Sequence, residues 1–169
     1  LKLNDTDKAV VLTSLLFALD AVDSTLGHFV SYLSKWSARS YNDLFLKLPN
    51  IKKTDGKHKI IKDDIFKVVE DHSFDLAYFD PPYGSNNEKM PPSRVRYASY
   101  YHIWTTVIKN DKPQLFGKVN RREDSRDLVA GSIFEEFRKN DEGNFIAMEA
   151  IRTLIQKTKA KYVLLSYSS

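Results

Sequence analysis

Apolar residues near the start of the chain recur at three- and four-residue steps, which is the spacing of an amphipathic helix. The pattern predicts a helix over residues 7–22, and Asp5 or Thr6 precedes it in a position to cap its first turn. The apolar stripe of this helix consists of Val11, Leu15, Ala18, Leu19 and Val22. Because such a helix packs by burying its stripe, we expect a scaffold element here.

Two further helices are predicted before the chain changes character. A second amphipathic helix is indicated by the spacing of Phe29, Leu33 and Trp36. A short third helix is expected over residues 40–48, because Pro49 would end it. Residues 1–50 are therefore interpreted as a helical segment.

After residue 57 the pattern changes to short, continuous apolar runs, which are typical of buried parallel strands. Residues 58–62 and 74–79 are the first two predicted strands, with a short helix over residues 65–69 between them. Another strand is predicted over residues 162–167. This order of strand, helix and strand indicates an α/β fold whose parallel strands are joined by right-handed crossovers.

Helices are also predicted in the last third of the chain. One is indicated by Ile133, Phe134 and Phe137, and a longer one by Phe145, Met148, Ile151 and Ile155. The longer helix precedes the last strand, so it completes a second crossover. Residues 57–83 and 128–169 are therefore assigned to the sheet and its helices, and residues 84–127 to a loop region between them.

The run at 74–79 ends in the tetrapeptide Asp80-Pro81-Pro82-Tyr83, at the edge where open α/β sheets bind ligands. Proline lacks an N–H and keeps the chain extended, so the Pro81 carbonyl can point into a cavity. This carbonyl and the Asp80 carboxylate form a double acceptor that suits an exocyclic amine with two N–H donors. The Tyr83 ring offers a face for a flipped-out base, a contact worth roughly 1–3 kcal/mol.

Positive charge is concentrated after the tetrapeptide. The whole chain carries a net charge of +4 and has a pI near 9.1. Residues 89–122 alone contain eight Lys or Arg residues against one acid, Asp111, and aromatic residues alternate with them. This composition suits phosphate contact and base stacking, with core packing as an equal alternative for the tyrosines. The candidate DNA contacts are Arg94, Arg96, Tyr97, Tyr101, Lys118, Arg121 and Arg122.

Composition limits the remaining classes. A chain of 169 residues with 42% hydrophobic residues is sufficient for one packed domain. The absence of cysteine excludes disulfides and thiolate metal sites, and it fits a cytosolic protein. No apolar stretch approaches the length of a membrane span, and no signal peptide is visible, so no membrane contact is expected. His102 lacks His or Cys companions at ligand spacing, so we expect a hydrogen-bonded structural histidine and no metal.

The tetrapeptide resembles the catalytic motif of S-adenosylmethionine-dependent DNA methyltransferases that modify the adenine amino nitrogen. Weaker matches to the Dam-like (D12) class are Asp64, Tyr100-Tyr101-His102, Gly117-Lys118 and Leu164-Leu165-Ser166-Tyr167. The similarity covers most of the chain from about Asp5 onward. It implies a bacterial, cytoplasmic enzyme that acts on double-stranded DNA, as part of a restriction-modification system with a cognate restriction endonuclease.

The resemblance also implies a fold and roles for individual residues. The fold is a Rossmann-like S-adenosylmethionine-dependent methyltransferase sheet flanked by helices, with residues 84–127 as a helical or loop insertion that recognises DNA. The tetrapeptide would hold a flipped-out adenine during direct methyl transfer to its amino nitrogen. An acid after the preceding strand accepts a hydrogen bond from the cofactor adenine in this family. Asp64 matches it best, with Asp63 beside it, and Asp80 is a further cofactor contact; helix capping is an equal alternative for Asp64.

The cofactor-binding glycine loop of the family is not found in this sequence. That loop has the form Phe-x-Gly-x-Gly, whereas no two of the six glycines here lie within three residues of each other. It precedes the tetrapeptide in the Dam-like order, so we expect it upstream of Leu1 and interpret residues 1–169 as the later part of one methyltransferase domain. Ser166 and Tyr167 are expected to emerge at the catalytic edge, where the family often has a polar loop.

Other substrates and another class of protein remain as alternatives. Protein glutamine and cytosine amino groups are disfavoured, because methylases of the first kind usually carry Asn and those of the second more often Ser at the position of Asp80. RNA adenine stays open, because phosphate contacts do not distinguish the two polymers. A non-catalytic nucleic-acid-binding module is the alternative from another class, and salt-dependent DNA binding without cofactor binding would favour it.

Overall fold

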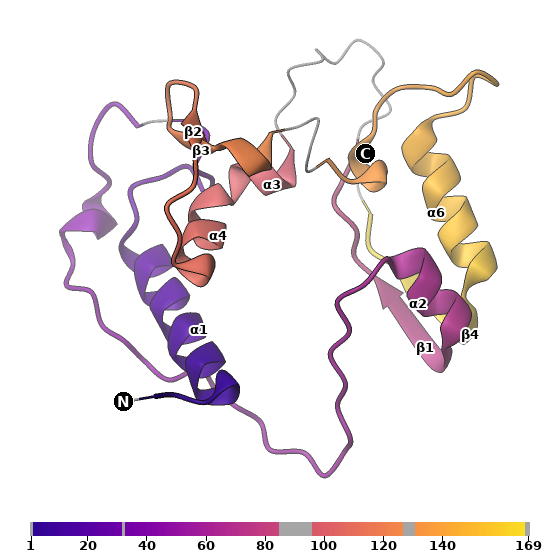
Figure 1. The fold of residues 1–169 in the computed structure, drawn as a ribbon, viewed down its shortest axis with the longest axis horizontal. Coiled ribbons are helices and arrows are strands. Elements are labelled where there is room, and N and C mark those ends of the chain that lie inside the picture. Colours follow the sequence, from indigo (N-terminus) through magenta and orange to yellow (C-terminus); the bar gives the residue numbers. More distant parts are fainter. Residues whose placement is uncertain (1, 32, 85–95, 127–130, 168–169) are drawn as a thin grey trace. The chain divides into compact units, whose positions relative to one another are not determined.

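The computed structural model describes residues 2–31, 33–84, 96–126 and 131–167. The chain divides into two compact units (Figure 1). The first unit consists of Leu1–Asp55 and Tyr97–Ala130, and the second of Gly56–Arg96 and Gly131–Ser169. Each unit is thus assembled from two separate stretches of sequence.

The first unit begins with α1 (Asp5–Val22), which confirms the first predicted helix. The side chain of Asn4 accepts a hydrogen bond of 2.8 Å from the backbone N–H of Asp7, so Asn4 is the N-cap. The predicted cap, Asp5 or Thr6, is therefore wrong. Asp5 and Asp7 lie in the first turn, where negative charge is stabilised by the helix dipole.

The second predicted helix, around Phe29, is wrong. Gly27 adopts a φ of +87°, and the described residues that follow, 28–31 and 33–37, form no helix. The N–H of Ser37 donates to the hydroxyl of Ser24 at 2.8 Å, and such side-chain bonds compete with helical ones. The residues of the supposed apolar stripe do not share one buried face, because Phe29 packs against Trp104 whereas Trp36 is 73% exposed.

The third predicted helix and the first predicted strand are also wrong. Only a 3₁₀ helix at Ala38–Tyr41 forms in place of the helix, and residues 42–64 contain no helix or strand. Leu48 is 80% exposed, and Ile60, in the middle of the predicted strand, is 98% exposed. A strand needs a partner for its backbone hydrogen bonds, and no described strand pairs with residues 58–62.

The rest of the first unit is built around a short helix and a hairpin. Its elements are α3 (Tyr97–Tyr100), α4 (His102–Lys109), β2 (Leu115–Phe116), β3 (Arg121–Arg122) and a 3₁₀ helix at Glu123–Ser125. β2 and β3 pair antiparallel. His102 is buried, and its Nε2 lies 3.2 Å from the carbonyl oxygen of Phe29, which confirms its structural role. Burial lowers the pKa of His102.

The second unit contains a small parallel sheet (Figure 1). Its elements are α2 (Ile65–Asp71), β1 (Ser73–Phe79), a 3₁₀ helix at Ile133–Glu135, α6 (Ile146–Lys157) and β4 (Lys159–Leu165). β1 and β4 pair in parallel, with Ala77 opposite Val163 and Phe79 opposite Leu165. The mixed α/β class and the strands around residues 74–79 and 162–167 are thereby confirmed, although the later strand begins at Lys159.

One face of this sheet packs on the core of the second unit. The core consists of Val69, Ala77, Phe79, Phe134, Ala150, Ile151 and Leu154. Side chains alternate along a strand, so Leu76 and Tyr78 point away from this core and are 54% and 62% exposed. The helix predicted over residues 133–137 is shortened to a single 3₁₀ turn, which a capping box between Ser132 and Glu135 starts.

Candidate active site

The carboxyl end of β1 leads directly into Asp80, Pro81, Pro82 and Tyr83, which we call the 80–83 turn. The N–H of Ser166 donates to the carbonyl oxygen of Phe79 at 2.8 Å, so strand pairing continues to the residue before the turn. The two prolines have no N–H with which to extend it. Asp80 is therefore released from the sheet, and its side chain is exposed.

Tyr83 folds back over the start of the turn. Its hydroxyl donates a hydrogen bond of 3.0 Å to Oδ1 of Asp80 and lies 3.2 Å from Oγ of Ser166. Its ring meets the ring of Tyr167 edge-on, with the centroids 5.7 Å apart. These contacts place Ser166 and Tyr167 beside the 80–83 turn, at the end of the sheet where they were expected.

The residue that follows the turn is enclosed. Gly84 is buried, and its N–H donates to the hydroxyl of Tyr167 at 3.0 Å. That hydroxyl donates in turn to the carbonyl oxygen of Phe134 at 3.1 Å. A Cβ on Gly84 would lie 2.7 Å from both oxygens, so only glycine fits without displacement.

A hollow of about 410 Å³ lies beside the 80–83 turn. Its polar lining includes Asp63, Asp80 and Ser132, and its apolar lining includes Phe79 and Phe134. Asp64 instead lines a separate hollow of about 500 Å³, together with residues of α6. The structure thus brings Asp63, and not Asp64, to the hollow that contains Asp80.

The two neighbouring acids have different local roles. Oδ1 of Asp64 accepts a hydrogen bond of 2.8 Å from the N–H of Phe66 and caps α2, which is the alternative role considered for this residue. Asp63 accepts hydrogen bonds from Nζ of Lys67 at 2.9 Å and from the backbone of Asp64 at 2.8 Å. These two donors, Lys67 first, hold the pKa of Asp63 below its usual value. Asp63 is therefore an ionised hydrogen-bond acceptor beside the hollow.

The side chains of the candidate DNA contacts differ in how much of their surface is exposed to solvent. Arg94 lies outside the described residues. The side chain of Arg96 is 11% exposed, and it lies 3.6 Å from the carboxylate of Glu136 and over the ring of Phe137. Tyr97 packs against two neighbouring tyrosines, of which Tyr101 is 42% exposed.

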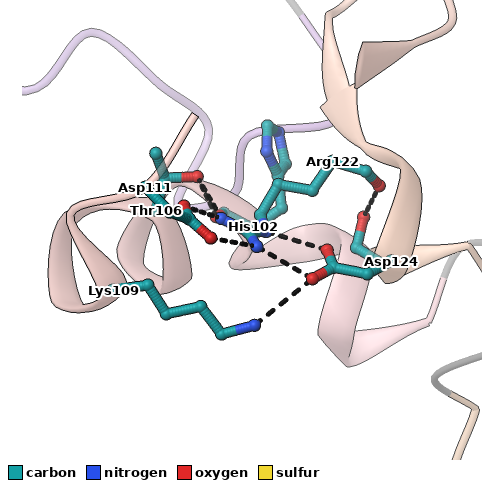
Figure 2. Close-up of polar contacts among 7 residues, drawn as sticks. His102, Thr106, Lys109, Asp111, Arg122 and Asp124 are labelled. Carbon is teal, nitrogen blue, oxygen red and sulfur yellow. Dashed lines mark hydrogen bonds and ion pairs between the residues drawn. The ribbon is translucent and has the colours of Figure 1, made fainter. Parts of the chain in front are cut away.

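Arg122, a predicted DNA contact, is buried at 2% exposure. Figure 2 shows its guanidinium between Asp111 and Asp124. Its Nη2 donates to an oxygen of each carboxylate at 2.8 Å. Hydrogen bonds from Arg122, and a weaker one from Lys109, hold the pKa of Asp124 well below its usual range. Arg122 thus joins the end of α4 to β3, and its burial disfavours the predicted phosphate contact, so we leave it out of the proposed DNA contacts.

The turn between β2 and β3 keeps an exposed basic surface. Lys118 lies at its tip and is exposed, and positive φ angles at Gly117 and Asn120 make the reversal tight. The guanidinium groups of Arg121 and Arg126 lie over the ring of Phe116, 4.6 and 4.5 Å from its centroid. We call residues 115–122 the basic hairpin.

Comparison with known proteins identifies the family. Residues 9–163 match the family model of the D12 class N6 adenine-specific DNA methyltransferases. The chain belongs to this family.

Curated relatives extend the match to particular enzymes. The Modification methylase StsI of Streptococcus sanguinis is 30% identical over 159 residues, which are 94% of this chain and 21% of the relative. The Type II methyltransferase M.FokI of Planomicrobium okeanokoites is 27% identical over 169 residues, covering 99% of this chain and 23% of the relative. The Type II methyltransferase M.NlaIII of Neisseria lactamica is 23% identical over 159 residues, 94% of this chain and 41% of the relative. The chain thus spans about a fifth of the first two relatives. No solved structure matches it.

Two features are absent from residues 2–31, 33–84, 96–126 and 131–167. No helix there has both the length and the apolar character needed to cross a membrane. Within the same ranges, no group of three or more His, Cys, Asp or Glu side chains is arranged to hold a metal ion.

Proposed function

We propose that this chain carries the catalytic turn of a site-specific methyltransferase that transfers a methyl group to the N6 amino nitrogen of adenine in double-stranded DNA. The observation that carries the proposal is the exposed Asp80 carboxylate beside Pro81, released from the end of β1 into a hollow. Membership of the D12 class supports adenine as the base and DNA as the polymer.

The chemical task is to make a poor nucleophile react. The lone pair of the adenine amine is delocalised into the ring. The Asp80 carboxylate and the Pro81 carbonyl would accept its two N–H bonds, draw the nitrogen toward tetrahedral geometry and stabilise the positive charge that develops as it bonds to the methyl carbon. The methylated nitrogen then loses a proton to solvent, so Asp80 need not be a strong base. Tyr83 would hold the flipped-out base through its ring.

The residues beside the turn fit the cofactor that the family generally uses. S-adenosylmethionine, when bound, would supply the methyl group from its sulfonium; the S–C bond would break, and the neutral thioether S-adenosylhomocysteine would leave with the electron pair. Asp63 and Asp80 line one hollow, and the ionised Asp63 is suited to accept a hydrogen bond from the cofactor's adenine amino group. We therefore transfer the expected cofactor role from Asp64 to Asp63, and infer that β1 and β4 belong to a Rossmann-like sheet.

The basic hairpin and the tyrosines of the first unit are the proposed DNA contacts. Lys118 and Arg121 would bind phosphates, and Tyr97 and Tyr101 would contact bases or sugars. Arg94 stays a prediction. Relatives named modification methylases, from bacteria, support a role in a restriction-modification system of the bacterial cytoplasm, with a cognate endonuclease as partner.

The test is transfer of labelled methyl from S-adenosylmethionine to unmethylated duplex DNA by the complete gene product. The wild type should label adenine at N6, and Asp80→Ala should not. Asp75→Ala is the matched control, because Asp75 is an exposed acid on β1, the strand that ends one residue before Asp80. RNA of the same sequence should remain unlabelled.

Two results would contradict this function. Labelling of RNA in preference to DNA would move the proposal to an RNA adenine methyltransferase. A folded, complete product that binds DNA in a salt-dependent way, but neither binds S-adenosylmethionine nor transfers methyl, would indicate a nucleic-acid-binding module.

A further inference from the structure

The two residues that follow β4 make a set of contacts with the 80–83 turn that strand pairing alone does not require. The backbone of Ser166 completes the pairing with Phe79, at 2.8 Å. Its side chain makes a separate contact, in which Oγ lies 3.2 Å from the hydroxyl of Tyr83. Tyr167 then places its own ring edge-on to that of Tyr83.

The hydroxyl of Tyr167 is a bridge between two backbone groups. It accepts the N–H of Gly84 at 3.0 Å and donates to the carbonyl of Phe134 at 3.1 Å. Both backbone groups come from other parts of the chain, one directly after the turn and one in the 3₁₀ helix before α6. Removal of this one oxygen would leave the buried Gly84 N–H without the acceptor it has here.

These contacts fix the turn from both ends. Phe79 is held by Ser166 before the turn, and Gly84 is held by Tyr167 after it. Between them, the neighbours of the Tyr83 hydroxyl include Asp80 and Ser166. If a substrate amine donates to Asp80, Tyr83 can retain Ser166 as its partner, so its ring need not turn away from the base.

We infer that Tyr167 and Ser166 are positioning residues for methyl transfer, which orient Tyr83 and Asp80 without contacting the substrate. The inference rests on the proposed function. It deepens that function by assigning the geometry of the catalytic turn to two hydroxyl groups beyond β4. A small displacement of a reacting group is costly, because the reaction requires near-attack geometry.

The experiment compares Tyr167→Phe with Tyr162→Phe in the complete enzyme. Each variant loses one hydroxyl and keeps its ring, and Tyr162 lies on β4 with 60% of its surface exposed. We expect Tyr167→Phe to lower kcat about tenfold and to leave KM for DNA and for S-adenosylmethionine within about twofold, because positioning acts on the transition state. Tyr162→Phe should match the wild type.

Hydrogen exchange of a peptide that contains Gly84 provides a second readout. The exchange should be faster in Tyr167→Phe than in Tyr162→Phe, because the Gly84 amide has lost its acceptor. Ser166→Ala is the second variant if Tyr167→Phe does not fold, and it should lower kcat about threefold.

Three outcomes would overturn the inference. Equal kcat values for Tyr167→Phe and Tyr162→Phe in an active enzyme would refute it and leave the proposed function intact. A lower thermal midpoint with an unchanged kcat per folded enzyme would show that Tyr167 has only a structural role. A wild type that methylates no DNA would remove the proposed function, and this inference with it.

Discussion

Asp80 and Arg122 are both charged residues to which the sequence assigned a role at the substrate, and the structure places them in opposite environments. Asp80 is exposed beside a hollow, and its carboxylate accepts a hydrogen bond from Tyr83. Arg122 is 2% exposed and makes five hydrogen bonds, to Thr106, Asp111 and Asp124. The backbone context of a charged side chain, and not the sign of its charge, thus decides whether it is exposed to a ligand.

The backbone explains each case. Asp80 follows the last paired residue of a strand and precedes two prolines, which have no N–H to donate to its carboxylate, so the carboxylate stays exposed. Arg122 lies in a short hairpin strand, between acids at positions 111 and 124 that can reach it from both sides (Figure 2). A guanidinium is buried only where such partners satisfy it. The positive charge of residues 89–122 therefore overstates the charge available to DNA.

The largest expected effect comes from the exposed member of the pair. Asp80→Asn keeps the shape of the side chain and removes its negative charge, so we expect methyl transfer to fall by about 10²- to 10³-fold. Its stability should change by less than about 0.5 kcal/mol, because the site is exposed. Methyl incorporation and chemical denaturation measure the two quantities, with Asp75→Asn as control. An Asp80→Asn enzyme with a third or more of wild-type activity would contradict the assignment.

At Arg122 we expect the main effect of a substitution to be on stability. Arg122→Met keeps most of the apolar length and removes all five hydrogen bonds, so the free energy of unfolding should fall by about 2 kcal/mol. The value is below that of a deeply buried pair, because Asp111 and Asp124 keep 37% and 49% of their side chains exposed and can regain water.

The control for Arg122 is an arginine in a surface ion pair. Arg152 is 64% exposed and lies 2.9 Å from Glu149, so Arg152→Met should cost less than about 0.5 kcal/mol. Denaturation curves of the two variants give the comparison. Equal losses of stability would mean that burial of Arg122 contributes nothing.

The same contrast explains how far the sequence predicts the fold. α1, β1, α6 and β4 were predicted because each carries a continuous local signal, either an apolar stripe or an apolar run. The helix around Phe29 and the strand at 58–62 were wrong because they depended on partners in space: His102 binds the Phe29 carbonyl, and no described strand pairs with residues 58–62. Tertiary contacts override a local pattern of this strength.

The candidate site likewise has one part that the sequence predicts and another that depends on contacts between distant residues. The 80–83 turn can be predicted from the sequence, because its prolines restrict the backbone of neighbouring residues. The contact between Gly84 and Tyr167 joins residues 83 positions apart, and no local pattern encodes it. For Arg122, the flanking acids at 111 and 124 were the available signal, since a buried arginine needs carboxylates within reach.

A smaller effect on stability is expected at Glu136. Like Arg122, and unlike Asp80, its side chain is largely buried and ion-paired. The hydrogen bond from Arg138 lowers the pKa of Glu136 from 4.5 to about 2. A lowered folded-state pKa stabilises the fold above the unfolded value, and this stability is lost as the pH falls from about 4.5 toward 2. Glu136→Gln should therefore flatten the loss of stability in that window, measured by thermal unfolding across pH. Glu142→Gln, at an exposed position, should leave the window unchanged; identical curves for the two variants would contradict the assignment.

The smallest expected effect is on DNA binding, and it distinguishes an exposed charge of the basic hairpin, Lys118, from a buried one, Arg122. If Lys118 contacts one phosphate, Lys118→Ala should weaken DNA binding several-fold at every sequence and reduce the slope of log K against log salt by about 0.9. Lys8→Ala, on the exposed surface of α1, should change neither quantity. Arg122→Met should weaken binding through a misplaced hairpin and keep the salt slope, because a guanidinium neutralised by two carboxylates releases no counterion. An equal fall of the salt slope in Lys118→Ala and Arg122→Met would mean that Arg122 leaves its carboxylates and contacts phosphates when DNA binds. Arg122 would then be available to a ligand in the complex, as Asp80 is, and the contrast between the two residues would hold only for the free protein.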